Sequence, residues 1–447
     1  MPAECLLISA NQVVTPYPVY PLGAACLLGS LQEKGHVASH FDVLADGGRE
    51  GLDDYLSGKR FDLVGVSIRN LDTVDSAAPD ECLTGVVEIV NLIRKNGIAP
   101  IVLGGSAFSI MPQALMELLD ADYGVVGEGE ELLPWLADKI ASGTPPAKKI
   151  FYAESRKQVW QKPVFTESNA RFYIKHGGML NVQTKRGCPH SCSYCSYPTI
   201  EGRKIRYRDP QDVADEVARL QIDYGARYIF FTDSVFNDGQ GHFLEVAEAL
   251  IRQNNKVPWS AFFRPQNLER DHLRLLKRSG LAAVELGTDA ATDITLAGIN
   301  KKISFDDVLE IHERVISEGI PCAHFIMFGG PDEDEETLRQ GLKNIEKLEK
   351  SVVFVFVGIR ILPGTAIFDR AVHDDLIKAD QSLLQPIFYF SPHVSRERIE
   401  EQVKQSFSHH MDRIYPSFEF EERIAMLHNM GHVGPLWNLV LGGQRRR

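Results

Sequence analysis

The chain has 447 residues, of which 44% are hydrophobic and 24% charged, and its formal net charge is −12. This length suggests two or three domains, and the acidic balance disfavours a nucleic-acid partner. The mean hydropathy of −0.15 and the shortness of the apolar runs exclude a membrane span. The first residues lack the basic region of a signal peptide. The composition therefore predicts a cytoplasmic protein with no nucleic-acid partner and no membrane span.

Strand and helix patterns alternate over residues 1–145. The strand-like runs are Glu4–Ser9, His36–Leu44, Leu63–Ile68, Ile101–Gly104 and Tyr123–Val126, and the helix-like runs are Leu22–Lys34, Leu83–Lys95 and Gln113–Leu119. This alternation predicts a Rossmann-like α/β domain with a parallel sheet and helices on both faces. Ligands of such sheets bind at the carboxyl ends of the strands. The glycine-rich segments at those ends are therefore either ligand contacts or ordinary βα turns.

Residues 146–175, which contain several prolines, are predicted to be a linker. A second alternating region covers residues 176–370. Its strands are expected at Leu180–Thr184, Tyr228–Thr232, Trp259–Phe263, Ala283–Gly287, His324–Phe328 and Val352–Ile359. Its helices are expected at Gln211–Tyr224, Phe243–Gln253, Asp271–Ser279, Phe305–Glu318 and Glu335–Leu348. Six βα repeats predict a partial (β/α)6 TIM barrel with its site at the carboxyl ends of the strands. Residues 371–447 lose the alternation and are predicted to be mostly helical.

Three of the seven cysteines, Cys188, Cys192 and Cys195, form a C-x3-C-x2-C segment directly after the first barrel strand. An odd number of cysteines in a long chain argues against a disulfide framework. Three thiolates on one loop can hold three irons of a [4Fe–4S] cluster and leave the fourth iron open. A zinc ion with His190 as a fourth ligand is the alternative. The other cysteines, Cys5, Cys26, Cys82 and Cys322, are expected to pack as small apolar residues.

The cysteine loop, with Tyr194 before the third cysteine, resembles the radical S-adenosylmethionine (SAM) superfamily over residues 176–370. The resemblance implies that the open iron binds SAM, that Asp233 accepts the SAM ammonium and that Arg264 pairs with its carboxylate or ribose. The implied cofactor contacts are Tyr194, Asp233, Ser234, Arg264, Glu285, Asp289, Gly329, Gly330 and Arg360. A buried acid or arginine at a strand end is also common as a structural ion pair.

The domain of residues 1–145 resembles the cobalamin-binding domains of one radical SAM class. The implied contacts are Ser67, Arg69, Asn70, Gly104, Gly105, Ser106, Gly127, Glu128 and Gly129. The Asp-x-His-x-x-Gly loop, which supplies a cobalt ligand in many cobalamin proteins, does not occur, and the domain's histidines are His36 and His40. Cobalt would therefore be bound without a histidine. Arg69 is expected to fence the lower face of the corrinoid, and an ion pair with Asp72 or Asp75 is its alternative role.

The two resemblances together imply a cobalamin-dependent radical SAM methyltransferase. It would methylate an unactivated carbon of a small-molecule, lipid, natural-product or peptide substrate and would receive electrons from a donor such as flavodoxin or ferredoxin. The substrate would enter between the domains, and the C-terminal candidates to line its site are Tyr389, His393, His409, His410, His428 and His432.

Three alternatives remain open. The first is a sibling enzyme that catalyses cyclisation or rearrangement without methyl transfer. The second is a methylthiotransferase, a family that needs three further cluster cysteines and a C-terminal RNA-binding β-domain; Cys5, Cys26 and Cys82 lack its surrounding motifs. The third is a non-catalytic iron–sulfur protein.

Overall fold

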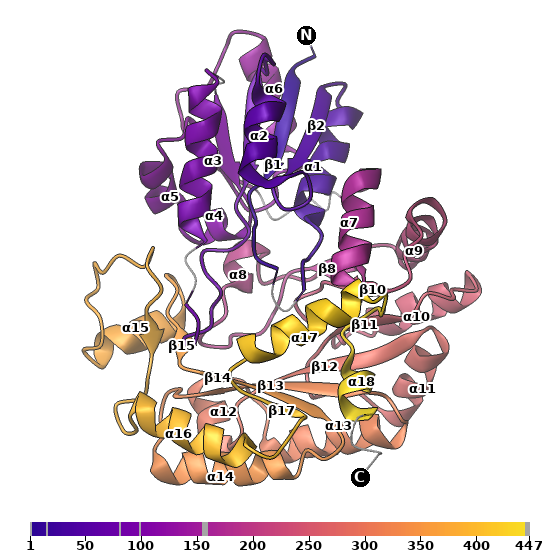
Figure 1. Ribbon diagram of the computed structural model, residues 1–447, viewed down its shortest axis with the longest axis vertical. Coiled ribbons are helices and arrows are strands. Elements are labelled where there is room, and N and C mark those ends of the chain that lie inside the picture. Colours follow the sequence, from indigo (N-terminus) through magenta and orange to yellow (C-terminus); the bar gives the residue numbers. More distant parts are fainter. Residues whose placement is uncertain (1, 15–16, 80–81, 98–99, 154–159, 443–447) are drawn as a thin grey trace.

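The computed structural model describes residues 2–14, 17–79, 82–97, 100–153 and 160–442 (Figure 1). An N-terminal α/β domain lies above a partial barrel, and the yellow C-terminal helix α17 (Phe418–Asn429) passes between them. No helix of the described residues is long and apolar enough to cross a membrane.

The N-terminal domain is a six-stranded parallel sheet in the order β2-β1-β3-β4-β5-β6. Its strands are β1 (Glu4–Ser9), β2 (Val37–Asp42), β3 (Leu63–Ser67), β4 (Ile101–Gly104), β5 (Tyr123–Val126) and β6 (Ile150–Tyr152). Its helices are α1 (Leu22–Glu33), α2 (Gly48–Leu56), α3 (Leu83–Lys95), α4 (Ser106–Ile110), α5 (Pro112–Leu119) and α6 (Leu132–Ala141). β6 pairs with β5, so the first part of the predicted linker belongs to this sheet.

Both faces of this sheet are buried, because alternate side chains of each strand enter different cores. Leu6 and Ile8 of β1 pack in the core shared with α2, α3 and α5, whereas Cys5 and Leu7 pack in the core shared with α1 and α6. The strand order reverses at β1, which lies between β2 and β3. A crevice therefore opens at the carboxyl ends of β1 and β3, as in other doubly wound sheets.

The barrel sheet runs in the order β17-β14-β13-β12-β11-β10-β7 with all strands parallel. Its strands are β7 (Leu180–Val182), β10 (Ile229–Phe231), β11 (Trp259–Phe263), β12 (Leu281–Asp289), β13 (Cys322–Phe328), β14 (Val352–Val357) and β17 (Arg413–Ile414). The helices between them are α9 (Pro210–Tyr224), α10 (His242–Arg252), α11 (Arg270–Arg278), α12 (Asp293–Gly298), α13 (Phe305–Ser317) and α14 (Glu335–Glu346). β7 and β17 do not pair, so the barrel is open as predicted.

The loop that carries the three cysteines is held by a short antiparallel ladder between β8 (Lys185–Arg186) and β9 (Arg206–Tyr207), with α8 (Tyr197–Ile200) between them. The predicted linker also contains α7 (Glu167–Gly177), which packs on the barrel core, while its residues 154–159 lie outside the described part. The C-terminal region contains α15 (Ala366–His373), α16 (Arg396–Phe407), α17 and α18 (Trp437–Gly442), and β16 (Phe388–Tyr389) pairs with β15 (Ile359–Arg360). It is mostly helical, and it also lends β17 to the barrel.

Candidate active site

Four charged side chains join the end of β5 to the base of the cysteine loop. Glu128 binds Arg206 through two hydrogen bonds and lies 3.1 Å from Arg186, and Glu130 lies 2.7 Å from Arg186. The two arginines hold the pKa of Glu128 below its usual range against the opposing effect of burial. Glu128 was predicted to contact a cofactor. Its carboxylate connects the two domains and still lines the cavity between them.

A second buried ion pair joins the domains on the opposite side of the interface. Arg360 Nε donates to Asp72 Oδ2 at 2.7 Å, and both side chains are almost fully buried. The remaining nitrogens of Arg360 donate to the carbonyls of Ile361 at 2.6 Å and Leu383 at 2.8 Å. All three guanidinium nitrogens are thus occupied, and the predicted contact of Arg360 with SAM gains no support from this arrangement.

The three cysteines lie close enough on one loop for their thiols to influence one another. Burial raises the pKa of Cys188, and of Cys195 to about 12, and the neighbouring thiols add to both shifts. Three thiolates suit three irons of an iron–sulfur cube, whereas a structural zinc ion needs a fourth ligand. The preference for a cluster rests on this ligand count and on the resemblance.

Cationic groups surround the cysteine loop. Arg264 Nη1 lies 3.9 Å from Cys192 Sγ, and Arg264 also donates to the carbonyl of Lys301. The charges of Arg264 and Lys301, together with burial, lower the pKa of His190 to about 4. A positive surrounding of this kind favours thiolates and the net negative charge of a cluster. Arg264 is therefore placed beside the cysteine loop, and its pairing with the SAM carboxylate or ribose stays a prediction.

Two further predicted contacts hold the loop against strand ends. Tyr194 donates to Asp289 at the end of β12, and Lys301 pairs with the same carboxylate. The Ser234 hydroxyl donates to the carbonyl of Gly187 at 3.2 Å. It also partly offsets the rise that burial causes in the pKa of Cys188. These side chains lie at the cluster loop, and their contact with SAM stays a prediction.

Asp233 lies under the same loop, and its carboxylate faces Thr184 and Lys185. It accepts hydrogen bonds from the backbone N–H of Thr184 at 2.7 Å and Lys185 at 3.3 Å and from the Thr184 hydroxyl at 2.5 Å. Lys185 Nζ lies 3.8 Å away and pairs more closely with Asp238, at 2.7 Å. Asp233 therefore fixes the strand that leads into the cysteine loop, and its predicted role toward the SAM ammonium is untested.

The turn after β13 was predicted to contact adenine. Gly329 has a φ of +88°, and its N–H donates to Glu333, whose pKa burial raises to about 7. A Cβ on Gly330 would lie 3.2 Å from Ile359. The turn is thus tightly packed, and a contact with SAM stays a prediction here as well.

A cavity of about 310 Å³ lies between the carboxyl ends of the N-terminal strands and the base of the cysteine loop. Of the residues predicted to contact cobalamin it includes Ser67, Arg69, Gly105, Ser106, Gly127, Glu128 and Gly129, and the barrel contributes Gln183, Arg186, Tyr197, Ile200, Glu201 and Thr232. It lies at the crevice between β1 and β3, where a doubly wound sheet binds its ligand. Asn70 does not line it.

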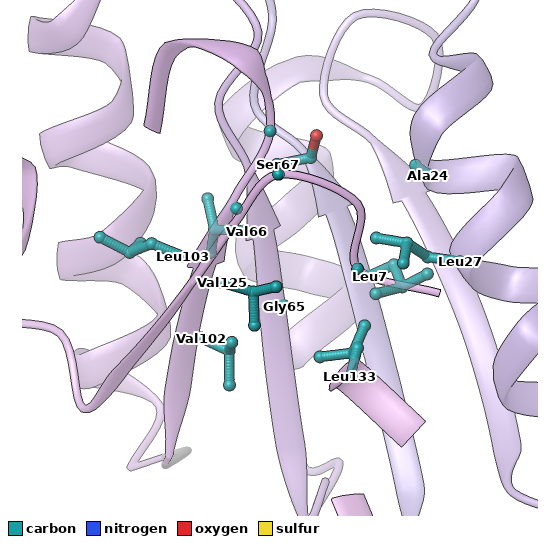
Figure 2. A pocket seen from close by; sticks show the side chains of 14 residues that line it. Leu7, Ala24, Leu27, Gly65, Val66, Ser67, Val102, Leu103, Val125 and Leu133 are labelled. Atoms are coloured by element: carbon teal, nitrogen blue, oxygen red, sulfur yellow. The ribbon is translucent and has the colours of Figure 1, made fainter. Parts of the chain in front are cut away.

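A narrow apolar slot continues from this cavity into the N-terminal domain (Figure 2). Leu7, Leu27, Val102, Val125 and Leu133 line it, together with several glycines. Gly105 has a φ of +97°, and a Cβ there would lie 2.5 Å from the carbonyl oxygen of Ile68. Only glycine fits this turn without strain. The cavity, which we call the corrin cavity, and the slot lie at the strand ends where the resemblance places the corrin ring and its nucleotide tail.

Arg69 is exposed to the cavity and has no ion pair among the described residues. Its alternative partners are engaged elsewhere, because Asp72 pairs with Arg360 and Asp75 accepts from the Ser417 hydroxyl at 2.6 Å. Burial lowers the pKa of Arg69, and three nearby phenols partly offset that shift. This placement agrees with a guanidinium that faces the corrinoid.

Neither histidine of the N-terminal domain lines the cavity or the slot. His36 accepts from the N–H of Ala3 at 3.1 Å, and His40 lies 2.8 Å from the Ser9 hydroxyl. Burial lowers the pKa of His40 to about 4. The geometry therefore agrees with cobalt that carries no histidine from this domain.

A third cavity, of about 520 Å³, extends from Arg69 into the lumen of the barrel. We call it the aromatic cavity, and the ring side chains that line it are Tyr17, Tyr197, Phe230, Phe262, Phe325, Phe354, Phe356, Phe418, Phe420 and Trp437. It shares Val19, Arg69, Tyr197 and Thr232 with the corrin cavity. Glu285, predicted to bind a cofactor, lies in its wall, whereas none of the three cysteines lines it.

The C-terminal region contributes to this cavity through residues that the sequence analysis did not select. The six predicted candidates, Tyr389, His393, His409, His410, His428 and His432, are absent from its lining. Tyr389 instead donates to Asp374 at 2.8 Å, and His428 bonds the carbonyl of Gly434 at 2.8 Å. The wall is formed by α17 and α18, with Phe418, Phe420 and Trp437. The role of the six residues at a substrate stays a prediction, whereas clustered aromatic residues were the available signal for this wall.

The remaining cysteines do not gather into a second site. Cys5 and Cys26 are buried in the N-terminal domain, and burial raises the pKa of each to about 12. Cys322 lies behind the barrel sheet near His312 and His324. Its sulfur is 3.6 Å from His324 Nε2, and the two imidazoles are 3.0 Å apart. Cys322 packs in the barrel core, as the sequence predicts, and its sulfur also meets the imidazole of His324.

Two family models match the chain. The B12 binding domain matches residues 8–137, and the radical SAM superfamily matches residues 182–345. These spans coincide with the sheet that carries the corrin cavity and with the barrel that carries the cysteine loop. The family models thus confirm both resemblances.

Several curated proteins and solved structures are similar to the chain. The tryptophan 2-C-methyltransferase of Streptomyces laurentii is 26% identical over 80% of this chain and 72% of its own length. The anaerobic magnesium-protoporphyrin IX monomethyl ester cyclase of Cereibacter sphaeroides is 27% identical over 72% of this chain and 55% of its own length.

The radical SAM methyltransferase TsrM of Kitasatospora setae, solved with cobalamin and a [4Fe–4S] cluster, has 23% identity and a TM-score of 0.85, covering 100% of this chain and 98% of that one. The cobalamin-dependent radical enzyme OxsB has 14% identity and a TM-score of 0.71, with coverages of 96% and 72%. Both likenesses show the fold. With a B12 domain, a radical SAM barrel and a matching cavity between them, the chain belongs to the cobalamin-dependent radical SAM enzymes.

Proposed function

We propose that this enzyme transfers a methyl group to an unactivated carbon of a small molecule that binds in the aromatic cavity. The observation that carries the proposal is the shared wall of the two cavities. Arg69, Tyr197 and Thr232 line both the corrin cavity and the aromatic cavity. A substrate in one cavity and a corrin in the other would therefore be neighbours, and methyl transfer needs such proximity.

The residues of the chain act mainly by placement. When bound, the cluster supplies an electron for the cleavage of SAM, and cobalamin carries the methyl group. Cys188, Cys192 and Cys195 would hold the cluster, and Arg264 would stabilise its negative charge. The interdomain ion pairs of Glu128 and Asp72 would keep the corrin cavity in register with the barrel.

Arg69 would face a bound corrin from the wall of the corrin cavity and would keep other ligands away from it. A guanidinium stays protonated in proteins and cannot itself bind a metal ion. The variant Arg69→Ala should therefore keep its cobalamin but show a changed cobalt absorption spectrum and a lower methylation rate. An unchanged spectrum and rate would remove this role from Arg69.

The finer assignments are also proposals. The electron donor would be a flavodoxin- or ferredoxin-type protein, because cleavage of SAM needs one electron at low potential. The enzyme would be cytoplasmic, because the reducing conditions of that compartment would protect the cluster from oxidation. Tryptophan is the first substrate to test, since a relative of the same architecture is a tryptophan 2-C-methyltransferase.

The test is anaerobic reconstitution with iron, sulfide, cobalamin and SAM. A candidate substrate should yield a methylated product together with S-adenosylhomocysteine and 5′-deoxyadenosine in equal amounts. Formation of 5′-deoxyadenosine alone would point to cyclisation or rearrangement. Failure to take up cobalamin would reject both functions.

A further inference from the structure

Glu285 is a buried carboxyl group in the wall of the aromatic cavity. The residue is 1% exposed, and its Oε1 atom has no hydrogen-bond partner among the described residues. Burial raises the pKa of Glu285 to about 8. A buried polar atom without a partner costs stability. The carboxyl group is therefore open to a partner that the described part of the chain does not supply.

The polar neighbours of Glu285 leave its free oxygen unsatisfied. The Trp437 indole N–H faces the carboxyl and lowers its pKa, yet Trp437 Nε1 itself has no hydrogen-bond partner in the described residues. The hydroxyls of Tyr228 and Ser260, which lie nearby, also have no hydrogen bond of good geometry among the described residues. No lysine or arginine of the described residues forms an ion pair with Glu285. Glu285 thus presents a buried, unsatisfied acceptor to a cavity whose lining also includes the polar residues Asp75, Asn181 and Glu421.

Aromatic rings form the largest part of the cavity wall. Phe325 and Phe354, on adjacent strands, are stacked with centroids 5.2 Å apart and planes 9° apart. Phe262 meets Phe325 edge-on at 5.9 Å, and Trp437 meets Phe354 at 5.2 Å and 64°. Phe262 is 40% exposed, although its neighbours on the strand are buried. Such walls favour a planar aromatic molecule, which can stack on one ring and meet the edges of others.

Glu285 lies deep in the barrel. It is the fifth residue of β12, four residues before Asp289 at the cysteine loop, and this separation is about 13 Å along a strand. Phe262 and Ala323 are its neighbours on the adjacent strands. Arg69 lines the same cavity and also faces the corrin cavity. In the proposed arrangement, a ligand bound to Glu285 would extend from there toward Arg69 and the corrin.

We infer that the substrate is a planar aromatic compound with a hydrogen-bond-donating nitrogen, which binds Glu285 while the ring packs on the phenylalanine walls. This inference rests on the proposed function and makes Glu285 a specificity-determining residue. A ring N–H and a side-chain ammonium group would each donate the hydrogen bond that Glu285 accepts. The carbon to be methylated would lie at the end of the molecule nearer Arg69.

The first test uses the wild-type holoenzyme, loaded with cluster and cobalamin, and calorimetric titration with three probes. Indole carries a ring N–H, benzofuran replaces that N–H by oxygen, and phenethylamine carries an ammonium group. Indole or phenethylamine, or both, should bind at least tenfold more tightly than benzofuran, and whichever binds more tightly identifies the nitrogen. Equal binding of all three probes, or no binding of any, would overturn the inference.

The second test uses Glu285→Leu and Glu285→Gln, with Glu313→Gln on the exposed face of α13 as a matched control. Glu285→Leu should lose the preference for the nitrogen probe and leave benzofuran binding unchanged. Glu285→Gln, which keeps a neutral acceptor, should lose less. The control should keep the wild-type preference.

Cobalamin loading, cluster absorbance and SAM binding are measured for every variant. If Glu285→Leu weakens SAM binding and leaves the preference for the nitrogen probe intact, Glu285 is a SAM contact and the inference fails, while the proposed function stands. If the wild-type holoenzyme binds the nitrogen probe but transfers no methyl group to any such compound, the proposed function fails and the binding site remains.

Discussion

The buried ion pair between Asp72 and Arg360 should make a large contribution to the stability of the domain interface. Arg360 Nε lies 2.7 Å from Asp72 Oδ2, and the side chains are 3% and 1% exposed. Removing one partner of such a pair costs about 3–5 kcal/mol, because the other charge stays buried without compensation. This is a substantial part of the roughly 5–15 kcal/mol that stabilises a typical folded protein. We expect Asp72→Ala to lower the unfolding midpoint of the 447-residue chain by roughly 3–5 °C, because the entropy of unfolding grows with chain length.

A double-mutant cycle separates the pair from its surroundings. Asp72→Ala leaves the Arg360 guanidinium with its two carbonyl acceptors. The double variant Asp72→Leu/Arg360→Met removes both charges and should recover much of the lost stability, since apolar replacements of buried pairs are tolerated. Arg274→Ala, at an exposed pair with Glu318, should change stability by less than about 1 kcal/mol.

The assay is calorimetric unfolding of the cobalamin-loaded protein under anaerobic conditions. A cost below about 1 kcal/mol for Asp72→Ala would refute the reasoning. So would a double variant whose loss equals the sum of the losses of its two single variants, Asp72→Leu and Arg360→Met. The two charges would then not depend on each other.

Three further outcomes are expected. Gly105→Ala should lose cobalamin, measured by absorbance after gel filtration, because its Cβ would lie 2.5 Å from the Ile68 carbonyl oxygen; Gly239→Ala, in open space, is the control, and normal loading of Gly105→Ala would contradict the assignment of the slot. Cys192→Ser should lose the cluster absorbance but keep cobalamin, and wild-type iron and sulfide content would count against the cluster site. The pKa of Glu285 is raised to about 8 in the folded protein from a usual 4.5. The folded state therefore holds the proton more tightly, and the stability that Glu285 contributes is complete below pH 4.5 and is lost as the pH rises to about 8, by at most about 1.4 kcal/mol per pH unit. Glu285→Gln should lack this component in denaturant titrations at several pH values, and an identical pH dependence would show that Glu285 titrates normally.

The periodic parts of the fold were predictable because their hydrophobic patterns are strong. The strands Glu4–Ser9, Ile101–Gly104 and Trp259–Phe263 and the helix Leu83–Lys95 have the predicted bounds. The strands that the sequence did not predict are short segments whose pairing depends on distant residues. β6 has three residues and β17 has two, and neither length carries a readable period.

Among the candidate site residues, the cysteine triad was predictable because its spacing alone specifies the chemistry. The roles of isolated charged residues were not. Arg360 and Asp233 were both selected from strand ends, where a ligand contact and a structural contact look alike. The fold decided their partners, Asp72 from the other domain for Arg360 and the backbone of Thr184 and Lys185 for Asp233.

By itself the sequence determined the two domains, their order and the cofactors, because local periodicity and motif spacing are properties of nearby residues. The tertiary structure alone decided how the domains meet. It brought Arg69, Tyr197 and Thr232 to a wall shared by two cavities. It also turned the phenylalanines of separate strands inward around Glu285, in a cavity that α17 and α18 close. These contacts join residues far apart in the chain, and the burial and charge that they create exist only once the two domains are packed together.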